Sequence, residues 1–362
     1  MTGPSESSLQ YSASPFFWPL AWAYAAGVRI KNFAYDRRWF ASRRLRWPVI
    51  SVGNLSVGGT GKTPLVLLLA NRLQARGWSV DVLSRGYGRS SQKAARVDPL
   101  GTPEEFGDEP LLMAHHGLAT YVGSDRYEPG RLAERAGAAG EDLSRRVHLL
   151  DDGFQHRKLA RTIDIVLLQR QDLNGRLLPA GRLREPLSAV RRADICVLRA
   201  EDVDLDPELP FRVTRWMQRP DREAAQARLW IVERRTTLPS PATSIGQAVA
   251  FCAIGNAHGF FHGLRQAGVD LQASIAFRDH HVYTRKDIER LRSAARSCGA
   301  QAFLTTEKDS VRLPAPLRAE LEKTGPLLFA GLEIFLREET RCLDTLEKLL
   351  QEPLQFQPGN VR

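Results

Sequence analysis

The hydrophobic pattern near the start of the chain alternates between short apolar runs and a longer helical stripe. An apolar run at 49–53 leads into a glycine-rich segment, and leucines then recur at helical spacing from Leu65 to Leu73. Pro64 suits the first turn of that helix, and a second apolar run follows at 79–84. A strand, a loop, a helix and a strand of this length predict the start of an α/β fold with parallel strands.

The glycine-rich segment between the first strand and the helix is suited to binding phosphate. Glycines allow backbone N–H groups to point at an anion, and the helix N-terminus adds its positive dipole end. Lys62 is then expected to contact the β- and γ-phosphates of a nucleotide, and Thr63 to bind magnesium. The usual spacing places a glycine six residues before the lysine, where this chain has Ser56. The expected nucleotide-binding residues are Ser56, Val57, Gly58, Gly59, Thr60, Gly61, Lys62 and Thr63.

Short apolar runs continue along the chain and predict further strands. The first half is expected to contain three more, at 147–150, 162–168 and 193–198. We interpret the acidic, proline-containing segment 201–210 as a linker, followed by two strands, at 211–216 and 229–233, that join the halves as a ribbon. The later runs predict a second α/β unit, with strands at 248–254, 274–277, 301–305 and 327–336 and helices at 258–266 and 285–297.

These elements predict an α/β protein with a parallel sheet of the P-loop NTPase type, flanked by helices, and a second, smaller α/β domain. A chain of 362 residues is long enough for two such domains. The expected boundaries are 1–46 for an N-terminal tail and a helix at the membrane surface, 47–205 for the P-loop core, 206–340 for the smaller domain with its two-stranded linker, and 341–362 for a C-terminal helix and tail.

Composition narrows the expected partners. The net charge of +10 predicts an anionic partner, which could be nucleic acid, acidic lipid or a phosphorylated substrate. The four cysteines are scattered and have no paired spacing, as in reduced thiols of a cytosolic protein. His280 and His281 lack a third ligand at useful spacing, so the pair does not predict a zinc site.

The segment 15–28 is apolar and aromatic, and seven basic residues follow it by Arg46. Its roughly 14 residues fall short of the ~20 needed to span a bilayer. A secretory signal would carry its charge before the apolar run. Aromatics beside a basic cluster favour a helix that lies on an anionic membrane surface, and a core helix with a solvated basic face is the alternative.

Two pairs of acidic residues lie at the ends of predicted elements, one pair at the end of a strand and one at the start of a helix. Asp151 and Asp152 end an apolar strand, where a P-loop enzyme needs a carboxylate to hold magnesium. Asp108 and Glu109 lie at the start of a helix, where helix capping is the simpler interpretation of composition alone. The turn 85–89 carries two arginines at a strand end and is either an anion contact or a solvated hairpin.

Several motifs together resemble one family. The motifs are Ser51–Pro64 (SVGNLSVGGTGKTP), Ser84–Arg89 (SRGYGR), Gly107–Pro110 (GDEP), Asp151–His156 (DDGFQH), Leu178–Pro186 (LPAGRLREP), Phe277–His280 (FRDH) and Thr306–Asp309 (TEKD). With these motifs the chain resembles the tetraacyldisaccharide 4'-kinases of lipid A biosynthesis from its N-terminal aromatic segment to about residue 336.

The resemblance implies transfer of the γ-phosphate of ATP to the 4'-hydroxyl of a tetraacylated glucosamine disaccharide 1-phosphate, with Mg²⁺ as cofactor. It implies Asp108 as the base working with His280, across a cleft that must close between two domains. The implied metal-binding residues are Thr63, Glu109, Asp151 and Asp152, and the implied substrate contacts are Asn54, Arg85, Gln155, Arg182 and Arg184.

The resemblance also implies a location, the cytoplasmic face of the Gram-negative inner membrane, with the enzyme attached to the surface. A lipid substrate and anionic lipids are then the expected partners, with neither nucleic acid nor an obligate protein partner. One alternative is a P-loop switch protein, although Thr306–Asp309 lacks the asparagine of a guanine-reading motif and lies in the second domain. The other is a basic, membrane-associated binding protein, whose basic residues would have to form an aromatic-interleaved stripe.

Overall fold

The computed structural model of the chain describes residues 17–137, 143–217 and 228–351. Of the expected terminal tails, at 1–14 and 351–362, all but Gln351 lie outside the described residues. The strands are β1 (Val49–Asn54), β2 (Ser79–Ser84), β3 (Ala95–Arg96), β4 (Ala119–Val122), β5 (Arg146–Asp151), β6 (Ile163–Leu168), β7 (Ile195–Arg199), β8 (Arg228–Thr237), β9 (Gln247–Cys252), β10 (Asp270–Ala276), β11 (Ala302–Thr306) and β12 (Leu327–Leu336).

The α-helices are α1 (Trp18–Asp36), α2 (Lys62–Ala75), α3 (Pro103–Phe106), α4 (Asp108–His115), α5 (Tyr127–Ala136), α6 (Ala200–Leu205), α7 (Leu209–Met217), α8 (Ala242–Ile245), α9 (Ala257–Gln266), α10 (Arg285–Cys298), α11 (Glu307–Ser310), α12 (Ala315–Glu322) and α13 (Glu339–Gln351). The described strands form one twelve-stranded sheet in the order β10-β9-β11-β12-β8-β7-β6-β1-β5-β2-β4-β3. Neighbouring strands are parallel, except β8 with β12 and β3 with β4.

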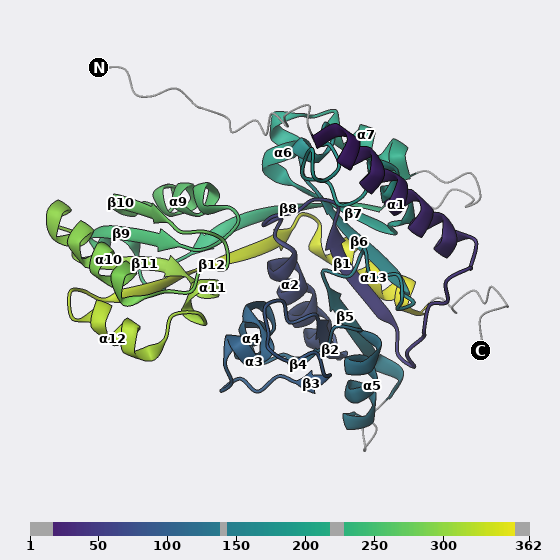
Figure 1. Cartoon of the computed structure of the whole chain (residues 1–362), viewed down its shortest axis with the longest axis horizontal. Coiled ribbons are helices and arrows are strands. Elements are labelled where there is room, and N and C mark those ends of the chain that lie inside the picture. The colour runs from purple at the N-terminus through teal and green to yellow at the C-terminus, as the bar shows by residue number, and fades with distance from the viewer. Residues whose placement is uncertain (1–16, 138–142, 218–227, 352–362) are drawn as a thin grey trace.

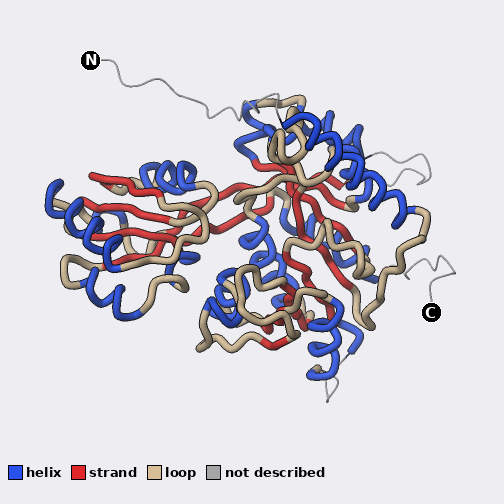
Figure 2. Tube along the Cα trace, in the orientation of Figure 1, coloured by secondary structure: helices blue, strands red, loops and turns tan. Residues whose placement is uncertain are grey.

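Two halves share this sheet (Figures 1 and 2). The larger half contains β1–β7 with the glycine loop, and the smaller half contains β9, β10 and β11 with helices α9, α10 and α12 around them. The long antiparallel strands β8 and β12 run between them, and each contains ten residues. The predicted fold class, a P-loop-type parallel sheet with a smaller α/β unit, is confirmed.

The predicted ribbon between the halves was wrong in one strand. Residues 211–216 belong to the helix α7, so β8 pairs with β12 instead. Apolar and polar residues alternate only from 211 to 214, and the buried positions Leu209, Val213 and Met217 recur every four residues, as in a helix. They pack in the core of the larger half together with Leu55 and other residues of that half. The predicted linker also begins with a helix, α6.

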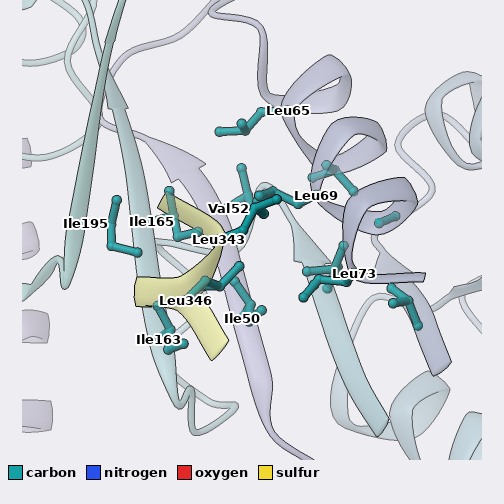
Figure 3. Close-up of a cluster of buried hydrophobic side chains, with 14 of the residues drawn as sticks. Ile50, Val52, Leu65, Leu69, Leu73, Ile163, Ile165, Ile195, Leu343 and Leu346 are labelled. Atoms are coloured by element: carbon teal, nitrogen blue, oxygen red, sulfur yellow. The ribbon is translucent and has the colours of Figure 1, made fainter. Parts of the chain in front are cut away.

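The core of the larger half holds the glycine loop in place. The strand β1 is buried along its whole length, and Leu65, Leu69 and Leu73 of α2 pack over it (Figure 3). Helix α13 returns from the end of the chain to the same cluster through Leu343 and Leu346. Each fully buried leucine contributes about 1.5–3 kcal/mol to stability. The C-terminal helix therefore supports the element that begins at Lys62.

Helix α1 is longer than the apolar segment predicts, and much of its apolar surface faces solvent. Trp22 is 66% exposed and Ile30 is 68% exposed. Tyr24 Oη donates to the Arg184 carbonyl at 2.9 Å, and Asn32 Nδ2 donates to Glu185 Oε2 at 2.8 Å, so the helix is held against the larger half. Among the described residues, no helix has the length and apolar character needed to cross a membrane.

Candidate active site

A cleft of about 1710 Å³ lies between the two halves and reaches α1. One wall contains the glycine loop, the end of β5 and the start of α4. The opposite wall contains α9, the loop at Asp279 and His280, and the segment around Lys308. The carboxyl ends of the parallel strands in the larger half face this cleft, as expected for ligand binding in open α/β sheets.

The glycine loop closes onto the N-terminus of α2. Gly61 precedes the helix with φ 93°, a left-handed conformation that side chains other than glycine rarely adopt. Residues 58–63 line the cleft, with no acidic residue in the first turn of α2. Ser56 and Val57 lie behind them, because Val57 N–H donates to the Arg182 carbonyl at 2.8 Å and Ser56 is fully buried. The exposed part of the loop is therefore the part that ends at the helix N-terminus, where an anion binds best.

Lys62 is held by polar groups from two strand ends. Its Nζ donates to Asn54 Oδ1 at 3.2 Å and lies 3.5 Å from Asp152 Oδ1. Asn54 is itself fixed, because its Nδ2 donates to the Ser56 carbonyl at 2.7 Å and its carbonyl accepts from Gln155 Nε2 at 2.8 Å. Asn54 thus lies behind Lys62 and orients it, whereas Gln155 lines the cleft.

The two aspartates at the end of β5 differ in their partners. Asp152 has φ 50°, an uncommon conformation for a residue other than glycine, and accepts from Arg184 at 2.8 Å. Burial raises the pKa of Asp152, but the combined effect of Lys62 and Arg184 lowers it by more, so the pKa lies below its ordinary value. The Oδ1 atom of Asp151 is buried without a hydrogen-bond partner. Burial and the charges of Glu109 and Asp152 raise the pKa of Asp151 to about 8.

A buried carboxylate oxygen without a partner, beside a second carboxylate and the hydroxyl of Thr63 on the loop, fits a magnesium ion. Magnesium is commonly bound by one or two carboxylates together with substrate phosphates and water. Within the described ranges, no group of three acidic, histidine or cysteine residues could hold a metal alone. The donor set therefore fits a magnesium ion that arrives with a nucleotide.

The start of α4 contacts the smaller half. Gly107, with φ 88°, turns the chain into α4, and a Cβ there would lie 2.9 Å from Gly86 Cα. The turn places Asp108 opposite the smaller half, and its Oδ2 lies 2.8 Å from His280 Nδ1. His280 also has a positive φ, 60°, and its ring lies 5.3 Å from that of Tyr87. Such strain in a residue other than glycine is common at functional sites.

Cations of the smaller half neutralise both acidic residues of α4. Arg312 Nε donates to Asp108 Oδ2 at 2.5 Å, and Lys308 Nζ donates to Glu109 Oε1 at 2.7 Å. Burial raises the pKa of Asp108, but His280 and Arg312 together lower it below its ordinary value. The capping interpretation of these residues is incomplete, since both lie in the first turn of α4 but neither caps it through its side chain.

Most of the residues expected at the site meet at this cleft. Those that line it are Gly58, Gly59, Thr60, Gly61, Lys62, Thr63, Arg85, Glu109, Asp151, Asp152, Gln155, Arg184 and His280. Asp108 lies at the rim through its bond to His280. Arg182 does not line the cleft, because its Nη2 donates to the Val57 carbonyl at 3.1 Å and so supports the loop.

Three residues of the site were missed in the sequence. Lys308 stands inside the motif 306–309 without an assigned role, and Arg312 follows it at helical spacing from Asp309. Arg126 lines the cleft, and burial beside Arg85 lowers its pKa to about 10. The motif itself was the only local signal for the first two, and Arg126 had none.

The motif 306–309 does not read a nucleotide base in this fold. Asp309 is fully buried, accepts from Thr306 Oγ1 at 2.6 Å and from Tyr283 Oη at 3.0 Å, and accepts from the Ala253 N–H. All of these partners belong to the smaller half. The alternative of a guanine-specific switch protein therefore loses the one feature that favoured it.

A parallel sheet whose first strand runs through a glycine loop into a helix, with a lysine beside strand-end carboxylates, defines the class of P-loop nucleotide-binding proteins. A family model described as LpxK, tetraacyldisaccharide-1-P 4'-kinase, matches residues 13–351. The chain belongs to this family, as its motifs predicted.

Individual relatives agree with the family model. A tetraacyldisaccharide 4'-kinase of Koribacter versatilis (strain Ellin345) is 42% identical over 343 residues, which cover 92% of this chain and 98% of the relative. One from Geobacter metallireducens is 39% identical and covers 90% of this chain and 95% of the relative. The crystal structure of LpxK from Aquifex aeolicus in complex with ATP superposes with a TM-score of 0.70 at 30% identity, over 92% of this chain and 98% of that one.

Proposed function

We propose that this chain transfers the γ-phosphoryl group of ATP to the 4'-hydroxyl of a tetraacylated glucosamine disaccharide 1-phosphate, forming the 1,4'-bisphosphate. Membership in the 4'-kinase family supports the reaction. The observation that carries the proposal is the pair of Asp108 and His280, 2.8 Å apart, which joins the two walls of the cleft that the loop ending at Lys62 also lines. The pair provides a proton acceptor at the same cleft as a phosphate-binding loop.

Phosphoryl transfer needs positioning and neutralisation of charge more than covalent chemistry. In the proposed mechanism, the amides of residues 58–63 and the Lys62 ammonium hold the β- and γ-phosphates. Thr63, Asp151, Asp152 and Glu109 would hold a magnesium ion, which would supply positive charge to the phosphates. Asp108 and His280 orient the acceptor hydroxyl and take its proton as the new O–P bond forms.

The two partners of the proton-accepting pair come from different halves. An open cleft would separate Asp108 from His280 and leave a bound nucleotide without an acceptor for the proton of water. Closure therefore couples assembly of the site to substrate binding and limits wasteful hydrolysis of ATP.

The proposed lipid substrate assigns a role to α1. Its exposed apolar residues would enter the headgroup region of the cytoplasmic leaflet of a Gram-negative inner membrane, and basic residues would contact anionic lipids. The helix lies beside the cleft, since Tyr24 and Lys31 line it and Lys31 Nζ donates to the Gln155 carbonyl at 3.2 Å. Arg85 and Arg184 are proposed contacts for the substrate 1-phosphate or for nucleotide phosphates. We propose neither nucleic acid nor an obligate protein partner.

The reaction is tested by transfer of labelled γ-phosphate to the disaccharide 1-phosphate lipid in detergent micelles. Wild type should label the lipid, and His280→Ala should lose about 10²–10⁴-fold of the rate while still binding ATP. His258→Ala, a change to another histidine lining the cleft, is the matched control and should retain most activity. Failure of folded, ATP-binding wild type to label the lipid would overturn the proposed acceptor.

The membrane role of α1 is tested by sedimentation with vesicles that contain anionic lipid. Trp22→Glu should weaken binding several-fold, since an exposed aromatic side chain proposed to enter the membrane is replaced by a charge that the anionic surface repels. Leu100→Glu is the control, because Leu100 is 93% exposed but belongs to a loop away from α1. Equal binding of all three proteins would contradict the proposed surface.

A further inference from the structure

Arg312 is a buried cation placed between the two halves. Its side chain is only 4% exposed, and it contacts Asp108, which is 204 positions away in the sequence. Nε donates to Asp108 Oδ2 at 2.5 Å, and Nη1 donates to the Ala253 carbonyl at 2.6 Å. Nη2 lies 3.1 Å from His280 Nδ1. One guanidinium thus contacts both members of the proposed proton-accepting pair.

The smaller half fixes this guanidinium without help from Asp108. Besides the Ala253 carbonyl, Asp309 Oδ1 lies 3.6 Å from Nη1. Asp309 is itself fully buried and accepts hydrogen bonds from Tyr283 and Thr306. The planar fork of arginine allows its other nitrogens to keep defined directions when one side is held. Arg312 therefore presents Nε to Asp108 when the halves meet.

The two contacts of His280 Nδ1 suit different protonation states. Nδ1 lies 2.8 Å from Asp108 Oδ2 and 3.1 Å from Arg312 Nη2. A protonated Nδ1 donates to the carboxylate, and an unprotonated Nδ1 accepts from the guanidinium. The ring keeps a partner in both states, so a proton can enter or leave the pair without releasing the imidazole from its position.

We propose that Arg312 is a positioning residue of the phosphoryl-transfer site, which holds the ionised Asp108 carboxylate against His280 and partners Nδ1 when that nitrogen carries no proton. This inference rests on the proposed function. Arg312 does not line the cleft and acts through the pair rather than on the substrate. Its charge also contributes to the lowered pKa of Asp108, against the opposing effect of burial.

The test compares Arg312→Met, which removes the charge, with Arg312→Lys, which keeps it without the fork. Arg318→Met is the matched control, since Arg318 lies in the same half, pairs with nearby Glu322 at 3.0 Å and lies over the Phe329 ring, away from the cleft. For Arg312→Met, we expect kcat to fall about 10- to 100-fold with KM for ATP within about twofold, because the pair is misplaced while the nucleotide loop is untouched. Arg312→Lys should recover part of the rate.

A second readout separates positioning from stability. The folded fraction of each variant is measured by urea unfolding, and the rate is expressed per folded molecule. This rate should still fall in Arg312→Met. A purely structural role would lower the folded fraction and the total rate together and leave the rate per folded molecule at its wild-type value.

A wild-type rate per folded molecule in Arg312→Met would overturn the inference. Should Arg312→Met fail to fold, Arg312→Lys decides in the same way, with a smaller loss expected and an unchanged rate overturning it. Failure of the proposed function is distinguishable, because wild type would then label no lipid.

Discussion

The site contains two pairs of adjacent acidic residues, and they are neutralised in different ways. Asp108 and Glu109 begin α4, and each meets a cation of the smaller half, Arg312 and Lys308. Asp151 is the last residue of β5, and Asp152 follows it, within the larger half. There, Asp152 contacts Lys62 and Arg184, while Asp151 Oδ1 is buried without a hydrogen-bond partner.

The pKa values follow the partners rather than the burial. Burial raises the pKa of Glu109, but the charge and hydrogen bond of Lys308 oppose this effect, and the pKa lies below its ordinary value. For Asp151, burial and two neighbouring carboxylates act in the same direction and raise the pKa to about 8. The first pair thus depends on closure of the two halves, whereas in the second pair Asp151 Oδ1 is left without a hydrogen-bond partner. Paired carboxylates therefore form a closing contact at the start of α4 and a metal-binding candidate at the end of β5.

The largest effect is expected when the closing contact is broken at Asp108. Asp108→Asn removes a charge that Arg312 and His280 meet, so activity should fall about 10²–10⁴-fold. Stability should fall by about 1.5–3 kcal/mol, because Arg312 loses one of its two carboxylate partners and keeps only the buried Asp309. Rates of phosphate transfer and urea unfolding curves measure the two effects.

Asp344→Asn is the control for this change, because its carboxylate lies on α13, outside the cleft, and is 62% exposed. It should alter stability by less than about 1 kcal/mol and leave the rate unchanged. Wild-type stability in Asp108→Asn would show that the buried pair with Arg312 contributes nothing to holding the halves together.

A smaller loss of activity is expected at Asp151, with a distinct dependence on pH. Its folded pKa of about 8 lies above the ordinary 3.8, so the folded protein binds a proton that the unfolded chain releases. Stability without magnesium and nucleotide should therefore fall as pH rises from about 4 to 8, by up to about 1.4 kcal/mol per pH unit. Asp151→Asn should flatten this slope and lower activity about 10- to 100-fold through weaker magnesium binding.

Unfolding at several pH values between 5 and 8 measures the slope for Asp151→Asn, wild type and Asp344→Asn. An unchanged slope in Asp151→Asn would mean that the carboxylate is already ionised at neutral pH without a bound cation. The proposed difference between the two acidic pairs, that Asp151 is protonated when no cation is bound, would then be wrong.

The next effect concerns the pair of Glu109 and Lys308. Either Glu109→Gln or Lys308→Met leaves a partly buried charge without its partner, whereas the double variant removes both charges. We expect the double variant to be more stable than the sum of the two losses predicts, with a coupling of about 0.5–3 kcal/mol. Unfolding of the four proteins measures it, and additive losses would show that the two residues do not interact in solution.

Local patterns predicted the strands and helices that carry the site. Period and turn residues located β1, the glycine loop and α2, and the apolar run before Asp151 located the end of β5. The rule that parallel strands end at one edge of a sheet then brought these residues together. The family motifs added Asp108 and His280, which no periodicity connects.

Contacts between the halves could not be derived in this way. Arg312 meets Asp108 across 204 residues and Lys308 meets Glu109 across 199, so no local signal pairs them. The helix α7 was missed for a different reason. The apolar Phe211 is 66% exposed, so its place in the sequence pattern does not show which face of the segment is buried. The burial of every fourth residue depends on the surface against which the helix packs.

The smallest effect is expected at the rim of the interface, where His116 Nε2 lies 3.4 Å from Glu307 Oε2. The hydrogen bond to Glu307 raises the pKa of His116 above 6.5, so its stabilisation is present below that value and is lost as pH rises through the folded pKa. Because both side chains are more than a third exposed, His116→Gln should cost less than about 1 kcal/mol at pH 6 and nothing at pH 9. Unfolding at both pH values in 0.15 M salt measures the difference. A loss as large as that of Asp108→Asn would place the energy of closure at the exposed rim and reverse the order argued from burial.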